Sequence, residues 1–99
     1  MARYRSPEYY SWQAARQRCR NPNNKDYPNY GGRGVIFHSE WDDFNKFYLH
    51  VGPRPEGHTL DRIDAYGNYE PGNVKWSTIS EQNKNQRRYY NSQLTLFLF

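Results

Sequence analysis

The chain has 99 residues, a formal net charge of +4 at pH 7 and one cysteine, Cys19. This length suits a single domain with a modest core, and one cysteine excludes an internal disulfide and a cysteine-cluster zinc site. Aromatic residues make up 18% of the chain, which favours a folded domain with a polar surface over a disordered one. No signal peptide or membrane-length apolar run is recognisable, so we expect a reducing, cytoplasmic setting.

The positive charge is concentrated in the first third of the chain. Residues 1–33 hold seven lysines and arginines against two acidic residues, whereas residues 34–58 are acidic on balance. A basic segment of this kind is typical of a surface that contacts nucleic-acid phosphates, although charge alone more often marks a solvated face. The residues expected to contact phosphates here are Arg16, Arg18, Arg20 and Arg33. The segment Gly31–Gly34 could approach phosphates through its backbone or form a plain turn.

The first predicted element is a helix that begins after Ser6. Serine at the N-cap, proline at the first helical position and Glu8 in the first turn are all typical of a helix start. The helix should run to about Arg20, where Asn21–Asn24 predicts a turn. We expect Tyr9, Trp12 and Ala15 on its inner face.

A short strand and a second helix are predicted in the middle of the chain. The strand covers Val35–His38, and the helix begins with the capping-box-like sequence Ser39–Asp42. Aromatic and aliphatic residues then recur at helical spacing, which predicts a core-facing side. These residues are Trp41, Phe44, Phe47 and Val51. The proline- and glycine-rich segment Gly52–Gly57 ends the helix.

Two strands and a third helix are predicted next, over Thr59–Ile63, Asn73–Ser77 and from Thr78 to about Arg88. Val74 and Trp76 alternate with a lysine, as in a half-buried strand. We therefore expect an α+β fold, a small single domain over residues 1–99. Residues 1–58 form the N-terminal helical and basic part, residues 59–88 a ββα unit, and residues 89–99 a tail. The apolar end of the tail is expected to pack on its own domain or on a second copy.

The residues that carry chemistry lie in the ββα unit. Hydrolysis of a phosphodiester needs a ligand for a hard metal ion, a cation for the phosphate and a group that activates water. Asp61, Arg62 and Tyr69 could supply these in that order.

The same segment resembles the HNH endonucleases, also described as ββα-metal or His-Me finger nucleases, and among them small phage proteins and homing enzymes. Their usual pattern has an Asp-His pair at the end of the first strand, an asparagine at the start of the second, and Asn or His nine residues later. Asp61 and Asn73 match this pattern, whereas Arg62 and Gln82 depart from it. One branch of HNH restriction enzymes carries Asp-Arg-x-Asp-x4-Tyr-x-Pro-x-Asn instead. This chain reproduces that spacing with Asp61, Arg62, Asp64, Tyr69, Pro71 and Asn73.

The resemblance implies a metal-dependent DNA endonuclease that uses Mg²⁺ or Mn²⁺. Asp61 would bind the metal, Arg62 the scissile phosphate, and Asn73 would brace the loop. Gln82 would be the second metal ligand, with Asn85 on the same face of the helix as an alternative. Tyr69 would handle the proton. His58 competes with it, because the ordinary pKa of histidine suits proton transfer near neutrality better.

Two other interpretations remain open at this point. The missing histidine and the glutamine at the ligand position also fit an HNH-like module that binds DNA without cutting it. The aromatic surface and apolar tail fit an interaction protein. For the nuclease, the partner is double-stranded DNA in a bacterial or phage-infected cell, with a homodimer needed for a double-strand break. Further phosphate contacts are expected from Lys84, Arg87 and Arg88 on the third helix.

Overall fold

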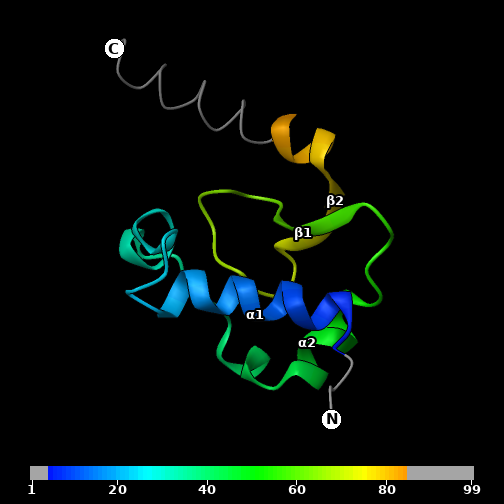
Figure 1. Cartoon of the computed structure of the whole chain (residues 1–99), viewed down its shortest axis with the longest axis horizontal. Coiled ribbons are helices and arrows are strands. Elements are labelled where there is room, and N and C mark those ends of the chain that lie inside the picture. The colour runs from blue at the N-terminus through cyan, green and yellow to red at the C-terminus, as the bar shows by residue number, and fades with distance from the viewer. Residues whose placement is uncertain (1–4, 85–99) are drawn as a thin grey trace.

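The computed structural model describes residues 5–84 (Figure 1). The helices are α1 (Pro7–Arg20) and α2 (Phe44–Val51), and the strands are β1 (His58–Arg62) and β2 (Val74–Thr78). Short 3-10 turns cover Tyr27–Asn29, Gly31–Arg33 and Ser39–Asp42. The expectations for Asn85, Arg87, Arg88 and the tail 89–99 fall outside the described residues. The described part is a small α+β domain, as the sequence predicted, and it contains no helix long and apolar enough to cross a membrane.

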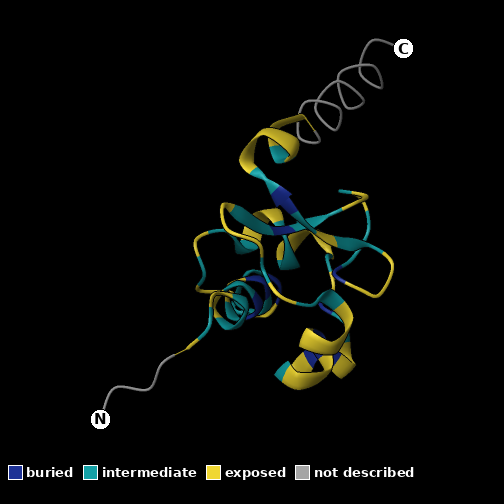
Figure 2. Cartoon of the chain, turned by 90° about the vertical axis from the view of Figure 1, so that its right-hand side faces the viewer, coloured by how far each residue is buried: buried dark blue, intermediate teal, exposed yellow. Residues whose placement is uncertain are grey.

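The first helix begins where the sequence places it. The Ser6 hydroxyl accepts a hydrogen bond of 3.1 Å from the backbone N–H of Tyr9, and Pro7 occupies the first turn. The helix crosses the middle of the molecule, with the sheet on one side and α2 on the other (Figure 1). Its buried residues face the interior (Figure 2), so α1 forms one side of the hydrophobic core.

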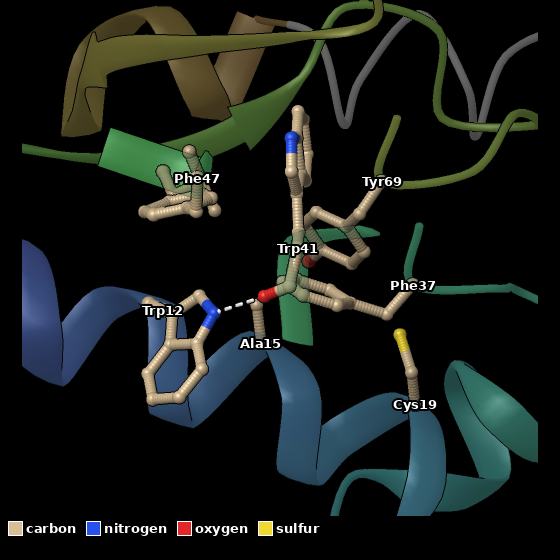
Figure 3. Close-up of a cluster of buried hydrophobic side chains, with 8 residues drawn as sticks. Trp12, Ala15, Cys19, Phe37, Trp41, Phe47 and Tyr69 are labelled. Atoms are coloured by element: carbon tan, nitrogen blue, oxygen red, sulfur yellow. Dashed lines mark hydrogen bonds between the residues drawn. The ribbon is translucent and has the colours of Figure 1, made fainter. Parts of the chain in front are cut away.

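The core is built largely from aromatic rings. Trp41, Phe37 and Phe47 are fully buried, and Phe44 and Val51 pack against them, which confirms the predicted apolar face. The ring nitrogen of Trp12 donates a 2.6 Å hydrogen bond to the carbonyl of Trp41, so the polar edge of this buried indole is satisfied (Figure 3). Ala15, Cys19, Leu60 and Tyr69 complete the cluster.

The second helix begins later than its sequence suggests. The segment Ser39–Asp42 forms a 3-10 turn, and α2 starts only after Asp43. The Asp43 carboxylate accepts a 2.9 Å hydrogen bond from the N–H of Asn45 and so caps the helix. The capping-box reading of Ser39 was therefore wrong, because the side chain that caps the helix lies four residues later.

The strand predicted over Val35–His38 is reduced to a single bridge. Phe37 pairs in parallel with Tyr69, which lies in the loop between β1 and β2. Tyr69 donates its N–H to the Ile36 carbonyl at 3.0 Å and accepts from His38 N–H at 2.8 Å. Because the partner is a loop and not a strand, the ladder does not extend. The bridge still fixes the loop against the core.

The two strands pair antiparallel, with Leu60 opposite Trp76 and Asp61 opposite Lys75. Leu60 and Trp76 face the core, so strand alternation places Asp61 on the opposite face. Helical residues follow from 79 to 84, the last described. The Thr78 hydroxyl accepts a 3.2 Å hydrogen bond from the N–H of Glu81, which confirms the predicted start of this helix.

Candidate active site

An open cavity of about 680 Å³ lies along the free edge of β1. Its lining includes four consecutive residues of β1 and none of β2, so side chains from both faces of β1 reach it. The opposite wall belongs to α1 and to the turns that follow it. The charged side chains that line it are Arg18, Arg33, Arg54, Arg62, Asp26 and Asp61. Four guanidinium groups against two carboxylates favour an anionic ligand.

Asp61 and Gln82 line this cavity together. The side-chain amide of Gln82 donates a hydrogen bond to the hydroxyl of Thr59, which lies two residues before Asp61 on the same face of β1. The structure thus places Gln82 beside Thr59 on the face of β1 that also carries Asp61, and both predicted metal ligands line the same cavity.

The donor set fits a hard divalent cation that the substrate helps to bind. No three His, Cys, Asp or Glu side chains within residues 5–84 come together as a metal cage. Mg²⁺ is commonly held by one or two carboxylates, several waters and substrate phosphates, so Asp61 with the Gln82 oxygen suffices for that type of site. Mn²⁺ accepts the same oxygen ligands.

Arg62 is held in a defined position at the end of β1. Its Nη1 donates a 2.9 Å hydrogen bond to the carbonyl of Gly67 in the β1–β2 loop. Its guanidinium lies 5.2 Å from the ring centre of Tyr30 and 5.3 Å from that of Tyr69. Arginine stacked in this way keeps its remaining N–H donors for another acceptor.

Tyr69 lines the same cavity but is only 2% exposed. Its hydroxyl accepts a 3.1 Å hydrogen bond from Nη2 of Arg18. Burial raises the pKa of the Tyr69 phenol above its ordinary value of 10, although Arg18 and Arg62 act in the opposite direction. The phenol is therefore protonated near neutral pH, which works against the role of general base that the resemblance implies.

His58 stands at the other end of β1, opposite Thr78. Strand alternation places its side chain on the face that Asp61 does not occupy, and it is not among the residues that line the cavity. Its Nδ1 lies 2.9 Å from the carbonyl oxygen of Glu56. The two candidate bases therefore differ in position. Tyr69 lines the cavity and has a raised pKa, whereas His58 lies outside the cavity.

Asn73 holds the loop between the strands. Its side-chain oxygen accepts from Asp64 N–H at 2.8 Å, and its amide group donates to the carbonyls of Asn68 at 2.7 Å and Asp64 at 3.2 Å. A Cβ on Gly67 would meet this amide nitrogen at 2.7 Å, so a larger residue there would displace the Asn73 side chain from its present position. The loop is thereby shaped to present the Gly67 carbonyl to Arg62, at the position where the resemblance implies a brace.

The three arginines at the end of α1 do not form one surface. Arg16 and Arg20 both bind the carboxylate of Asp42, and Arg20 also donates to the Phe37 carbonyl. Arg18 lies on another face of the helix and lines the cavity. Of the remaining candidates, Arg33 is exposed and also lines the cavity, and Lys84 is exposed at the end of the described chain.

Sequence reasoning missed two residues of the site. Arg54 binds the His58 carbonyl and donates to the Ser11 hydroxyl at 3.2 Å, so it joins the segment before β1 to α1. Tyr30 lies beside both Arg18 and Arg62. No local pattern distinguishes Arg54 from a solvated arginine. Only the position of Tyr30, directly before two glycines, could have drawn attention to it.

The glycine segment after Tyr30 has a packing role. A Cβ on Gly31 would meet the carbonyl oxygen of Cys19 at 2.1 Å, so this turn can lie against the end of α1 only with glycine there. The glycine at this position is thus explained by the packing of a turn against α1, which was one of the two interpretations of Gly31–Gly34.

Comparisons with protein-family models, with curated proteins and with solved structures find no match to this chain.

Proposed function

We propose that this chain is a divalent-metal-dependent DNA endonuclease of the HNH type, which hydrolyses phosphodiester bonds at the cavity along β1. The observation that carries the proposal is the meeting of Asp61, Arg62 and Gln82 at one arginine-rich cavity. Two things support the proposal: the sequence spacing that resembles the Asp-Arg branch of HNH enzymes, and the presence of these three residues in the lining of one cavity.

The chain's own groups divide the work on the phosphate. Asp61 and the Gln82 oxygen would hold Mg²⁺ or Mn²⁺, which when bound supplies Lewis-acid stabilisation of the leaving 3′-oxygen. Arg62 neutralises charge on the phosphoryl oxygens as water attacks phosphorus. Because Gly67, Tyr30 and Tyr69 already hold this guanidinium, little reorganisation is needed as that charge develops.

The proton of the attacking water has two candidate acceptors. The resemblance assigns it to Tyr69, which lines the cavity. Histidine has the ordinary pKa better suited to proton transfer near neutrality, but His58 is not among the residues that line the cavity. We retain Tyr69 as the assignment and His58 as its competitor, to be separated by kinetics.

Arg33, which is exposed and lines the cavity, would contact the DNA backbone, and the exposed Lys84 is a further candidate for such a contact. One site per chain would nick one strand as a monomer, and a double-strand break would need a second copy. The lone cysteine is compatible with the cytoplasm of a bacterial or phage-infected cell.

A second candidate function is DNA binding without cleavage. It is favoured by two observations: the Tyr69 hydroxyl, which would act as base, is buried and has a raised pKa, and no histidine of the described residues lines the cavity. Such a module would retain the arginine-rich cavity and bind duplex DNA in a salt-dependent way.

Incubation of supercoiled plasmid with Mg²⁺, Mn²⁺ or EDTA separates the two functions. The nuclease gives nicked circles with either metal and none with EDTA. Salt-dependent binding without any nicking would support the binding module instead. Absence of salt-dependent binding to DNA of arbitrary sequence would leave the interaction-protein interpretation.

A further inference from the structure

Tyr30 lies between two arginines that come from distant parts of the chain. The guanidinium carbon of Arg18 is 5.0 Å from the ring centre of Tyr30, and that of Arg62 is 5.2 Å from it. The Tyr30 ring also stacks on Tyr69, with 6.3 Å between centres and 23° between planes. Both guanidinium groups line the same cavity as Asp61.

Neither of these two arginines is held in an ion pair by the part of the chain that the structure describes. Within residues 5–84, Arg18 and Arg62 form no ion pair, and the acceptors of their hydrogen bonds are the Tyr69 hydroxyl and the Gly67 carbonyl. Arg16 and Arg20, on the same helix as Arg18, share the Asp42 carboxylate. The cavity therefore carries an excess of positive charge, with four guanidinium groups against the carboxylates of Asp26 and Asp61.

Arg18 is also less completely bonded than a purely structural arginine would be. Its Nε–H is buried and has no hydrogen-bond partner, and its one bond to another side chain uses Nη2. Because a partly bonded, half-buried guanidinium is costly, an anion in the cavity that Arg18 lines would stabilise its charge. Burial opposes the charge, but the interactions with Tyr69 raise the pKa of Arg18 above its ordinary value, so the charge persists.

We propose that Arg18 is a second phosphate-binding residue of the site, which contacts the DNA backbone beside Arg62, and that Tyr30 positions the two guanidinium groups. The inference rests on the proposed function for its ligand. The inference goes beyond the proposed function because it assigns the phosphate contact of α1 to Arg18 alone. Arg16 and Arg20 are excluded from that contact.

The test is the binding of a short DNA duplex of arbitrary sequence without metal. Binding is measured by fluorescence anisotropy at several salt concentrations. Each phosphate contact contributes about 0.9 to the slope of log K against log salt. Arg18→Gln should lower this slope by about 0.9 and weaken binding about eightfold at 0.1 M salt. Arg16→Gln is the matched control, because it removes the same charge from the same helix outside the cavity, and it should leave the slope unchanged. Equal slopes for the wild type and Arg18→Gln would overturn the proposal.

The wild-type protein provides a second measurement, which holds even if Arg18→Gln fails to fold. Arginine Nε–H signals are followed by NMR while the same duplex is added in EDTA. The signals of Arg18 and Arg62 should shift, and those of Arg16 and Arg20 should stay in place. A bound complex in which the Arg18 signal is unmoved contradicts the inference.

The role of Tyr30 is tested by two substitutions. Tyr30→Phe retains the ring and should bind the duplex like the wild type, whereas Tyr30→Leu removes the ring face and should lower the slope as Arg18→Gln does. Equal behaviour of the two variants would remove Tyr30 from the proposal. Because no metal is present, these binding results do not depend on cleavage. If the variants bind DNA as predicted but the wild type does not nick plasmid with metal, the nuclease proposal is contradicted and the role of Arg18 is retained.

Discussion

The guanidinium of Arg18 donates a 3.1 Å hydrogen bond to the hydroxyl of Tyr69, although the two residues are 51 positions apart in the chain. This bond joins α1 to the loop that connects β1 and β2. The same loop carries Gly67, whose carbonyl accepts from Arg62, and it ends at Asn73, whose amide donates to the Asn68 carbonyl. The contact between Arg18 and Tyr69 therefore helps to hold the loop of the candidate site against α1.

Replacement of Tyr69 by phenylalanine should destabilise the fold. The ring still fills its place in the core, but Nη2 of the half-buried Arg18 loses its acceptor. Loss of one partner of a buried hydrogen bond typically costs about 1–3 kcal/mol. Urea unfolding of wild type and Tyr69→Phe measures this difference, and identical midpoints would show that the bond does not stabilise the folded state.

The raised pKa of Tyr69 predicts a loss of stability in alkali. The folded protein holds this proton more tightly than the unfolded chain, so the contribution is fully present below about pH 10 and disappears as pH rises above it. The free energy of unfolding should therefore fall more steeply above about pH 10 in the wild type than in Tyr69→Phe. Parallel curves for the two proteins would contradict the direction of the shift.

Cleavage kinetics should identify the group that accepts the proton. Loss of a general base typically lowers the rate by about 10²–10⁴. If Tyr69 is the base, Tyr69→Phe falls in this range and His58→Ala changes little. Since the pKa of Tyr69 is raised, the wild-type rate should also keep rising with pH up to about 10. The opposite ranking of the two variants would assign the base to His58.

Arg62→Lys should slow single-turnover cleavage by about 10²–10³, and Arg62→Ala should slow it further. Lysine retains a charge but lacks the planar fork that now bonds Gly67 and lies over two tyrosine rings. Binding of uncut duplex should change much less, because other basic residues share the backbone. Arg16→Lys, outside the cavity, is the control. Wild-type cleavage with weakened binding would make Arg62 a docking residue.

Local signals were sufficient for most of the secondary structure. Ser6 and Pro7 begin α1, and Thr78 with Glu81 begins the last helix, because capping bonds span only three or four residues. Both strands lie within one residue of their expected limits. Asp61, Arg62 and Gln82 then came together because a strand and the helix that follows the hairpin carry them.

Contacts between distant segments were beyond such signals. The segment Val35–His38 has the composition of a strand, but in the structure Phe37 forms only an isolated bridge with Tyr69. The sequence near Phe37 does not indicate that its partner lies in a loop. Arg16, Arg18 and Arg20 read as one basic group, although helical geometry separates Arg18 from the other two. Arg16 and Arg20 bind Asp42, and Arg18 binds Tyr69. These partners are distant in sequence, so the residues near the arginines do not predict them.

The central claim is tested most directly by metal-dependent nicking of supercoiled plasmid by Asp61→Asn, with DNA binding measured in parallel. The account predicts no nicking with Mg²⁺ or Mn²⁺ and nearly unchanged binding, since the variant loses the one carboxylate proposed to hold the metal. Asp64→Asn is the matched control, because it removes the same charge three residues later and retains the oxygen that accepts from Tyr66 N–H. Nicking by Asp61→Asn at close to the wild-type rate would contradict the account.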